Sequence, residues 1–465
     1  NTLVYNRIMI KVQISNKQSD SFASKYCRLV LTEDPATKHR FVENSNGSTE
    51  YRMGIGKKKK ITPRTFRSLI RSVYQTTKSH QIEFLVVDYA EINFSNLETL
   101  GQTWLGSTVA ENFLLASYEF RTYKTQKKVP PTLKEITISN ASDKNFAAGL
   151  KRGLILGEEI NKARDLANMP GCDMTPKAFG EAAKKMAAGT KVSVKVLSKA
   201  EITKLKMGAL LAVGQGSINP VQFIVAEYWG QGKSKKNQPT VLIGKGITYD
   251  SGGLNIKPTG AMHDMHLDMS GGASVLSAVV VAAKLGLKKN VIALVPVAEN
   301  AISDTAMRAG DIVTSMSGQT IEVLHTDAEG RMVLADALTY SKRYDPKVIL
   351  DVATLTGAAL VALGQLASAV MTKDKNLSDK LVTLGEESGD LMWPLPLWDE
   401  YKQSLKSHRA DVSNISTTFS RFGGAIEGGS FLSFFTPKKV SWAHIDIAPR
   451  MESIAADKLA KGATG

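Results

Sequence analysis

A chain of 465 residues is too long for one ordinary core, so two or three domains are expected, and its 43% apolar content is typical of a folded protein. No run of eighteen apolar residues occurs, and Asn1 to Val12 lacks the apolar core of a signal peptide, so we expect no membrane association. The only cysteines, Cys27 and Cys172, argue against a disulfide framework and favour the cytoplasm.

The formal net charge of +15 has two interpretations. A basic chain fits nucleic-acid binding, but genome composition alone can produce the same excess, and we favour the second interpretation. The basic residues lean toward the N-terminal third, most visibly in Lys57–Lys60, which is followed by Arg64, Arg67 and Arg71. A short lysine run is usually a solvated loop, so at most sequence-indifferent nucleic-acid binding is expected.

Residues 1–145 are expected to form a small N-terminal α/β domain without a chemical motif. Apolar and β-branched runs predict its strands, and helical periodicity predicts its helices, the first of which opens after Pro63. The predicted strands are Ile8–Ile14, Cys27–Leu31 and Phe84–Val87, and the predicted helices are Thr65–Thr77 and Glu111–Tyr123.

Residues 146–168 are predicted to be a linker helix, because apolar side chains recur at helical spacing until Pro170 and Pro176 interrupt the pattern. In residues 169–465, predicted helices alternate with predicted strands, which indicates an α/β catalytic domain with a central mixed, largely parallel sheet flanked by helices. The helices are expected at 179–188, 202–205 and 272–285, and the strands at 192–197, 222–228, 241–243 and 291–297.

Two clusters of charged residues follow predicted strands of this second domain. The first, after the strand 241–243, is a glycine-punctuated loop with Lys245, Asp250, Lys257 and Asp268. Gly252 and Gly253 permit backbone angles that suit a loop wrapped around a ligand.

The second cluster lies between a short strand beginning at Ile321 and a helix from Arg331 onward. It holds Asp327, Glu329 and Arg331, and an open α/β sheet binds ligands at such junctions. Together the three aspartates and one glutamate roughly neutralise two divalent cations such as magnesium, manganese or zinc. Lys245 could join them as a ligand only if nearby dications lower its pKa.

Other motifs are weaker. Gly244-Lys245 is followed by Gly246 rather than Ser or Thr, which excludes a Walker phosphate loop, and the Gly214–Gly216 segment lacks the third glycine of a dinucleotide site. His263 and His266 are close to Asp268 in sequence and could be soft metal ligands. His325 and His444 border the charged segments and are expected to orient neighbours, and Ser251 has no Asp-His relay.

These segments and their intervals resemble the leucyl (cytosol) aminopeptidase family of two-metal exopeptidases. The resemblance covers about residues 155 to 465 with high specificity, whereas before residue 150 it rests mainly on Phe113–Tyr118. The segments that carry it are Lys245–Gly253, Lys257-Pro258, Asp268, Thr326–Arg331, Arg164–Asn168, Asp351–Gly357, Trp442–Ile447 and Lys461–Gly465.

The resemblance implies two divalent ions per subunit, Mn²⁺ or Zn²⁺, and a specific set of ligands. Lys245, Asp250, Asp268 and Glu329 would hold one ion, and Asp250, Asp327 and Glu329 the other. Lys257 would stabilise the oxyanion, while Arg331 would hold a bicarbonate ion that carries the proton from water to the leaving amine.

The resemblance also implies a side-chain pocket for Leu-like residues, lined by Met265, Thr354, Leu355 and Gly357. His325 departs from the usual Asn, and Glu427-Gly428-Gly429 departs from a common Thr-Ala-Ala. We expect the missing methyl groups of the two glycines to leave extra room in the pocket. Because an unpaired buried carboxylate is costly, we expect Glu427 to point into solvent or an intersubunit contact. The chain stops at Gly465, inside a segment that normally continues in the family, which suggests a missing or disordered tail.

Two functions remain in view. The first is a cytoplasmic homohexameric aminopeptidase that releases N-terminal, preferably Leu-like, residues from peptides. The alternative is a basic DNA-binding regulatory protein on the same hexameric scaffold. A full ligand set favours the first, and the basic N-terminal domain permits the second as an addition.

Overall fold

The computed structural model describes residues 10–125, 133–234, 236–418 and 422–465. The chain divides into two compact units, the first made of Asn1–Asn161 and Ile454–Lys461 and the second of Lys162–Ser453 and Gly462–Gly465. This division differs from the one expected from the sequence, in which a linker helix over residues 146–168 separates the two domains. The break falls inside the long helix α4 (Lys144–Ala167), and a short C-terminal segment returns to the first unit.

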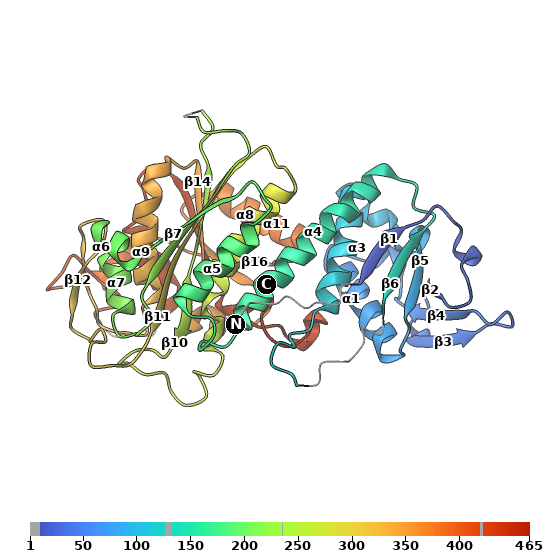
Figure 1. Ribbon diagram of the computed structural model, residues 1–465, viewed down its shortest axis with the longest axis horizontal. Helices are drawn as coiled ribbons and strands as arrows, with labels where there is room; N and C mark the ends of the chain where they lie inside the picture. Colours follow the sequence, from blue (N-terminus) through green and yellow to red (C-terminus); the bar gives the residue numbers. More distant parts are fainter. Residues whose placement is uncertain (1–9, 126–132, 235, 419–421) are drawn as a thin grey trace. The chain divides into compact units, whose positions relative to one another are not determined.

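The first unit is built on a six-stranded sheet in the order β1-β6-β5-β2-β4-β3. All neighbouring strands are parallel except β3, which pairs antiparallel with β4. Figure 1 shows α1 and α3 side by side on one face of this sheet. The strands are β1 (Lys11–Ile14), β2 (Cys27–Thr32), β3 (His39–Glu43), β4 (Thr49–Gly54), β5 (Phe84–Asp88) and β6 (Glu135–Ser139), and the helices are α1 (Pro63–Ser79), α2 (Tyr89–Ile92) and α3 (Gln102–Ser117).

Local sequence signals explain where the helices of this unit begin. Thr62 caps α1 by accepting a hydrogen bond from the Thr65 backbone, and Pro63 occupies the first helical position, where its missing N–H costs nothing. Close packing of α4 on α3 depends on glycine, because a Cβ on Gly149 would lie 2.2 Å from the Thr103 carbonyl oxygen. The cap fixes where α1 begins, and the glycine allows α4 to pack closely on α3.

The predicted elements of the first unit are mostly present, with shifted bounds. Ile8 and Met9 of the first predicted strand lie outside the described residues. The helix predicted at Glu111–Tyr123 is α3, which begins and ends earlier, at Gln102 and Ser117. Strands β3, β4 and β6 were not predicted, because their polar and aromatic residues obscure the alternation that marks a strand.

The second unit is built on a nine-stranded mixed sheet in the order β16-β15-β18-β14-β9-β11-β8-β7, with β10 pairing β11. Strands β18, β14, β9, β11 and β10 run parallel, and antiparallel pairs join β15 to β18, β8 to β11 and β7 to β8. The strands are β7 (Ser193–Leu197), β8 (Gln222–Trp229), β9 (Thr240–Gly244), β10 (Gly246–Asp250), β11 (Asn290–Asn300), β14 (Val348–Ala353), β15 (Ser368–Met371), β16 (Met392–Leu395) and β18 (Ser441–Asp446).

Helices cover both faces of this sheet, with α5 and α8 on one face and α7 and α9 on the other (Figure 1). The apolar side chains between the layers, such as Ile243, Leu294 and Leu334, are fully buried. The two-domain α/β fold with a mixed, largely parallel sheet is therefore confirmed. The helices are α5 (Pro176–Ala187), α6 (Lys199–Lys204), α7 (Gly208–Gly214), α8 (Ser270–Lys284), α9 (Gly330–Ser341), α10 (Gly357–Leu363), α11 (Lys375–Ser388) and α12 (Gly424–Ser433).

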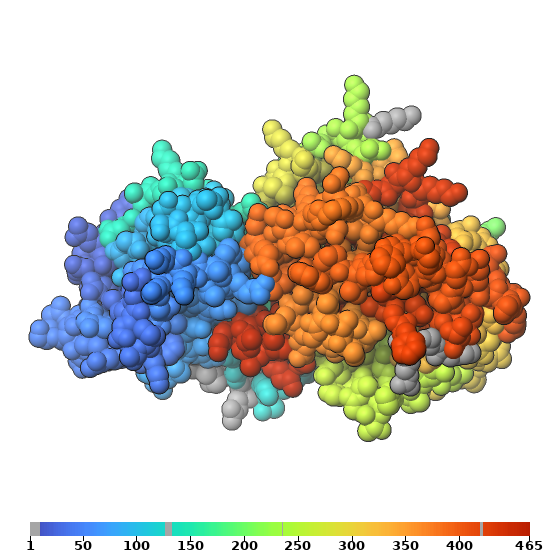
Figure 2. Space-filling view, turned by 180° about the vertical axis from the view of Figure 1, so that it is seen from behind, coloured from blue at the N-terminus to red at the C-terminus, as the bar shows by residue number. Residues whose placement is uncertain are grey.

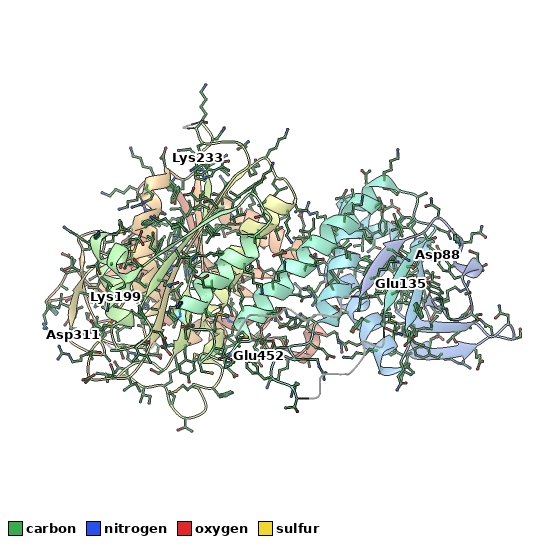
Figure 3. All side chains as sticks on the ribbon, viewed as in Figure 1. Asp88, Glu135, Lys199, Lys233, Asp311 and Glu452 are labelled. Atoms are coloured by element: carbon green, nitrogen blue, oxygen red, sulfur yellow. The ribbon has the colours of Figure 1, made fainter. Side chains whose placement is uncertain are left out.

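A smaller three-stranded sheet supports one side of the second unit. It contains β12 (Ile312–Thr314), β13 (Thr320–Glu322) and β17 (Val412–Ser413), with β13 parallel to β17. Figure 2 shows that the C-terminal part of the chain, orange to red, makes up much of one face of this unit. In Figure 3, Lys233 lies at the tip of the turn that follows β8, and Asp311 lies at the outer edge of the second unit.

One helical stretch, Met265–Lys284, is long and apolar enough to cross a membrane by length and composition alone. It is mostly buried inside the second unit and contains the 3₁₀ turn Met265–Met269 followed by α8. Its apolar character is explained by its position against β8, β9, β11 and β14 of the central sheet. It is a core helix of the fold.

Candidate metal centre and active site

The carboxyl ends of neighbouring parallel strands bring polar side chains to one edge of the large sheet. Lys245 follows β9, Asp250 ends β10, Asn300 ends β11 and Thr354 follows β14. The pairing registers set β9 against both β11 and β14, and β10 against β11, so these ends are neighbours. This edge is where open α/β sheets bind ligands.

The loop after β10 contributes two further charged groups. It turns at Gly252 and Gly253, which have φ values of 85° and 66°, angles that favour glycine. A Cβ at Gly252 would also lie 3.1 Å from Asp327 Oδ1, so the loop lies against the second charged segment. Beyond the turn come Lys257 and, in the 3₁₀ turn at Met265–Met269, Asp268.

The second charged segment joins β13 to α9 and carries Asp327 and Glu329. Glu329 stands at the start of α9, and Gly330 follows it as the first helical residue. A Cβ on Gly330 would lie 2.6 Å from the Lys245 ammonium nitrogen. A side chain here would have to displace the end of Lys245, so glycine leaves the lysine room to reach the glutamate.

Lys245 forms a buried ionic cluster with two carboxylates. Its Nζ lies 2.8 Å from Asp268 Oδ2 and 2.8 Å from Glu329 Oε1, and it donates to the Thr354 carbonyl oxygen at 3.0 Å. Burial lowers the pKa of Lys245, but the surrounding carboxylates outweigh it and raise the pKa overall. Burial raises the pKa of Asp268 well above its ordinary value, although Lys245 opposes the rise.

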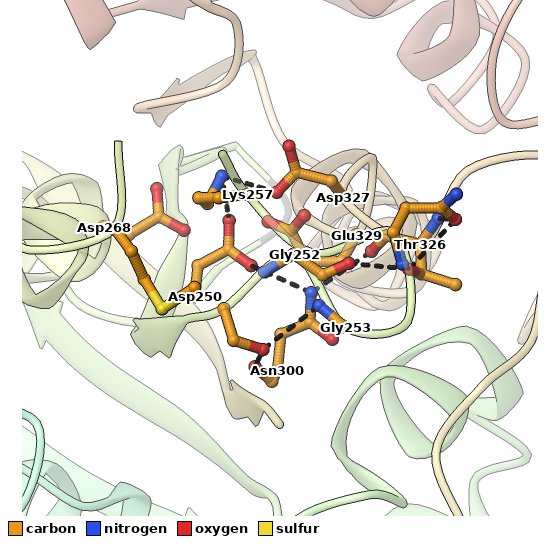
Figure 4. Close-up of polar contacts among 12 residues, drawn as sticks. Asp250, Gly252, Gly253, Lys257, Asp268, Asn300, Thr326, Asp327 and Glu329 are labelled. Atoms are coloured by element: carbon orange, nitrogen blue, oxygen red, sulfur yellow. Dashed lines mark hydrogen bonds and ion pairs between the residues drawn. The ribbon is translucent and has the colours of Figure 1, made fainter. Parts of the chain in front are cut away.

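Lys257 lies between two other carboxylates, as Figure 4 shows. Its Nζ is 2.8 Å from Asp250 Oδ2 and 2.5 Å from Asp327 Oδ1. Burial lowers the pKa of Lys257, whereas Asp250 and Asp327 raise it by a larger amount. The Lys257 side chain retains 14% exposure, against 3% for Lys245, so it is less deeply buried than the other lysine.

The carboxylates form a donor set that fits divalent metal ions. One ligand oxygen from each of Asp250, Asp327 and Glu329 lies within 4.8 Å of the others. Glu329 Oε2 is buried and has no hydrogen-bond partner among the described residues, so it remains available as a donor. Hard oxygen donors with this excess of negative charge suit magnesium, manganese or zinc. The structure thus brings together the five predicted ligands, Lys245, Asp250, Asp268, Asp327 and Glu329.

Two asparagines were missed in the sequence and hold the site in place. Asn300 donates from Nδ2 to Asp250 Oδ1 at 2.8 Å and to the Thr326 carbonyl at 3.1 Å. The Asn414 side chain accepts from the Leu324 backbone at 2.8 Å, so it fixes the segment that carries Asp327. Asn300 could have been found as the polar end of an apolar strand, whereas nothing in the sequence around Asn414 marked it.

The histidines singled out in the sequence have partners outside the carboxylate groups of the cluster. His263 pairs with Asp264 at 2.8 Å, and His266 contacts the His263 carbonyl. His325 Nδ1 accepts a hydrogen bond from the Asp327 backbone at 3.3 Å, and buried His444 lies 2.5 Å from Asp351. The last two therefore orient neighbouring groups, as expected.

Of the predicted pocket residues, Thr354 contacts the Lys245 cluster directly. Thr354 Oγ1 donates to Asp268 Oδ1 at 2.6 Å, and the Leu355 backbone donates to Asp446 at 3.0 Å. Met265 opens the 3₁₀ turn that carries Asp268. Gly357 faces open space, since a Cβ built there would meet nothing within 4 Å.

The extra room expected at Gly428 and Gly429 is absent. A Cβ on Gly428 would lie 3.0 Å from Leu355 Cδ2, and one on Gly429 would lie 2.9 Å from Met371 Sδ. The neighbouring side chains already fill the space of the missing methyl groups. The expectation of an enlarged pocket was therefore wrong.

The expectation that Glu427 points into solvent or an intersubunit contact was also wrong, because the residue is buried within the chain itself. The residue lies in the first turn of α12 with 7% exposure, and its carboxylate interacts electrostatically with Arg331. Arg331 is itself 7% exposed and donates from Nη1 to the Asn414 carbonyl oxygen at 2.8 Å. The cost that argued against burial of this carboxylate is reduced by the nearby guanidinium.

Comparison with known proteins follows the same division of the chain. Residues 161–465 match the family model "Cytosol aminopeptidase family, catalytic domain", and residues 51–127 match the corresponding N-terminal domain. A "Probable cytosol aminopeptidase" of Nitrosospira multiformis is 40% identical over 91% of this chain and 81% of its own length. Another, of Saccharophagus degradans, is 39% identical over 97% of this chain and 89% of its own length.

Solved structures of related enzymes have the same fold as this chain. A tomato leucine aminopeptidase mutant superimposes with a TM-score of 0.87 at 28% identity, covering 99% of this chain and 95% of its own. The bottromycin maturation enzyme BotP, in complex with Mn, gives a TM-score of 0.84 at 31% identity, covering 95% of this chain and 97% of its own. The chain belongs to the cytosol aminopeptidase family and is an aminopeptidase, a peptide-hydrolysing enzyme.

Proposed function

We propose that the chain is a two-metal aminopeptidase that releases N-terminal residues from peptides, with Leu-like residues preferred. The observation that carries the proposal is the gathering of Asp250, Asp327 and Glu329, with their ligand oxygens within 4.8 Å of one another, beside two lysines. The manganese named in the BotP structure supports a divalent metal, with Mn²⁺ or Zn²⁺ as the proposed ions.

The five cluster residues would hold the metals in the sets that the family resemblance implies. Lys245, Asp250, Asp268 and Glu329 would hold one ion, and Asp250, Asp327 and Glu329 would hold the other. When bound, such a pair activates a water molecule and orients the amine and carbonyl of the substrate. The bound dications would also oppose the protonation of Lys245 that the carboxylates favour in their absence.

Lys257 is the group best placed to stabilise charge on the substrate. It contacts Asp250 and Asp327 and keeps part of its surface exposed, so its ammonium can also donate to an oxyanion that develops beside these carboxylates. Lys245, with 3% exposure and contacts to Asp268 and Glu329, has no such freedom. The two lysines therefore have different proposed roles, one as a ligand and one as an oxyanion stabiliser.

The proposed pocket for the substrate side chain is formed by Met265, Thr354, Leu355 and Gly357. The open space at Gly357 and the aliphatic chain of Leu355 support apolar contacts with Leu, Met or Phe. Each additional buried methylene contributes about 0.8 kcal/mol, or roughly fourfold in specificity. Glu427 is engaged electrostatically with Arg331, so we expect no preference for Lys or Arg.

The experiment compares Leu, Met, Phe, Ala and Lys anilides by kcat/KM, using chelated enzyme to which Mn²⁺ or Zn²⁺ is restored. We expect metal-dependent hydrolysis, with Leu, Met and Phe ahead of Ala and Lys. An N-acetylated peptide should resist cleavage, because its blocked amine cannot occupy the site. Metal-independent cleavage, or efficient cleavage of the acetylated peptide, would contradict the proposal.

Other features of the family remain predictions for this chain. They include a homohexamer, a cytoplasmic location, which the relatives' printed names support, and a bicarbonate ion at Arg331. No step of the proposed mechanism passes through bicarbonate. Nucleic-acid binding, the alternative function, also remains a prediction.

A further inference from the structure

Asp446 is a buried carboxylate to which the proposed mechanism gives no role. It is the last residue of β18, in parallel register with Ala353, the last residue of β14, and it is 0% exposed. It therefore lies at the carboxyl edge of the large sheet, as the proposed metal ligands do, although it is not one of them. A carboxylate this deep in a protein needs hydrogen bonds or a compensating charge.

The hydrogen bonds to Asp446 come mainly from the loop between β14 and α10. Its Oδ1 accepts from the backbone N–H groups of Leu355 at 3.0 Å, Thr356 at 3.4 Å and Ala448 at 3.1 Å. Its Oδ2 accepts from the Thr356 hydroxyl at 2.7 Å. That hydroxyl also accepts from the Ala359 backbone at 3.1 Å and so caps α10. One carboxylate thus fixes both the loop and the start of the helix that follows it.

This loop contacts the metal cluster and also lines the proposed substrate pocket. Thr354 accepts from Lys245 Nζ through its carbonyl oxygen at 3.0 Å and donates to Asp268 Oδ1 at 2.6 Å, so the proposed ligands themselves hold this residue. Leu355, the next residue, lies with its side chain against α12, since a Cβ on Gly428 would be 3.0 Å from Leu355 Cδ2. The backbone of Leu355 therefore has a support separate from the metal ligands.

We propose that Asp446 is a positioning residue that determines specificity, because it holds Leu355 in place as a wall of the substrate pocket. The inference rests on the proposed aminopeptidase function, in which Leu355 contacts Leu-like side chains. Without the carboxylate, Leu355 and Thr356 would lose their three hydrogen bonds to it, while Thr354 would keep its contacts to the metal ligands. Substrates with long apolar side chains should therefore be affected, and metal binding should stay intact.

The test compares kcat/KM for Leu and Ala anilides in excess Mn²⁺, with the wild type, Asp446→Ala and Asp446→Asn. Asp446→Ala should lose about tenfold with the Leu substrate and little with the Ala substrate, because one or two methylene contacts, each worth roughly fourfold, are lost only with the longer side chain. Asp446→Asn keeps an oxygen for the backbone N–H groups and should restore the wild-type ratio of the two kcat/KM values. Metal analysis should find the wild-type metal content in both variants.

Asp374→Ala is the matched control, because Asp374 caps α11 and accepts from the Ser441 hydroxyl at 2.6 Å at the opposite end of β18. It should lower stability without changing the ratio, since partial unfolding lowers both kcat/KM values equally. An unchanged ratio in Asp446→Ala, or a loss of bound metal from it, would overturn the inference and leave the proposed function standing. A metal-loaded wild type that releases no leucine would instead contradict the proposed function itself.

If Asp446→Ala does not fold, two variants of Thr356 decide. Thr356→Ser keeps the hydroxyl that donates to Asp446 Oδ2 and should keep the wild-type ratio. Thr356→Val removes this hydroxyl at nearly the same side-chain volume and should lower the ratio by about fourfold, the contribution of one methylene contact. Equal ratios in the two variants would overturn the inference.

Discussion

The two units place very different groups at the carboxyl edge of their parallel sheets. In the first unit this edge carries Asp88, which ends β5, and Glu91, which follows in α2. Asp88 caps α2 through the Ala90 backbone at 3.0 Å, and Glu91 accepts from the Leu31 backbone at 3.1 Å. In the second unit the equivalent edge gathers several carboxylates and two lysines around one point.

The difference shows that a parallel sheet provides the location of a site but not its chemistry. At the edge of the first unit, each carboxylate is occupied by a nearby backbone N–H and serves the local fold. In the second unit, Asp250, Asp327 and Glu329 converge from two distant segments. Asp250 Oδ1 accepts from the Gly252 backbone, but Glu329 Oε2 is buried without a hydrogen-bond partner among the described residues. Function follows from this surplus of buried charge rather than from the architecture.

The sharpest test compares Asp250→Ala with Asp88→Ala, since each aspartate is the last residue of a parallel strand. Asp250→Ala should abolish hydrolysis and lower the metal content, because the proposed bridging carboxylate would serve both ions. Asp88→Ala should leave kcat and metal content unchanged and lower the free energy of unfolding by about 1 kcal/mol, the usual cost of an N-cap. Metal analysis measures the metal content of both variants, and denaturant unfolding measures their free energies of unfolding. Two tightly bound ions in Asp250→Ala would refute its assignment.

Lys257→Ala should have the next largest effect. The loss of one oxyanion stabiliser is expected to lower kcat by roughly 10²–10³ while the metal content stays intact. Lys288→Ala, which removes an exposed lysine of the same unit, is the control and should behave as wild type. A Lys257→Ala rate within a few fold of wild type would remove this residue from the mechanism and weaken the contrast between the two sheet edges.

Sequence reasoning located the second sheet edge because its signals are local. Asp250 follows a short strand, and Asp327 and Glu329 precede a helix, so residue order alone placed them at loop positions. The strand β10 itself was missed, since glycine and polar residues interrupt its apolar pattern. The family resemblance, rather than periodicity, joined the two segments into one site.

What the sequence could not supply was side-chain packing. The occupied space at Gly428 depends on Leu355, seventy-three positions earlier, and the burial of Glu427 depends on Arg331 in a different helix. Two glycines in place of larger residues were interpreted as a gain of room, although neighbouring side chains fill that space. Asn414 was missed for the same reason, because its partners are distant in sequence.

Asn300→Ala tests whether supporting groups matter at the second edge. Its amide holds Asp250 Oδ1 at 2.8 Å, so its loss should reduce metal affinity by about 10–100-fold, as for other residues that orient ligands. Asn290, at the opposite end of the same strand and bonded to the Gly232 and Asn237 carbonyls, provides the control. Asn290→Ala should change stability without changing metal affinity, which titration with a metal-buffered solution can measure. Equal metal affinities in the two variants would show that Asp250 needs no support from Asn300.

The smallest expected effect concerns the basic segment of the first unit. Lys57, Lys59 and Lys60 are exposed, but Arg67 is 4% exposed and donates to the Pro63 carbonyl, and Arg71 donates to Asn112. The surface available to phosphate is therefore narrower than the sequence from Lys57 to Arg71 suggested.

A triple Lys57→Ala, Lys59→Ala, Lys60→Ala variant should hydrolyse peptides at the wild-type rate, because none of the three lies in the catalytic unit. If the wild type binds DNA at low salt, each lost phosphate contact should flatten the dependence of log K on log salt by about one unit. Fluorescence anisotropy with two unrelated duplexes over a salt series measures the slope. Equal binding of both duplexes supports a solvated lysine run. Tight binding of one duplex at physiological salt would show that the first unit recognises a specific DNA sequence. The contrast between a structural unit and a catalytic unit would then no longer hold.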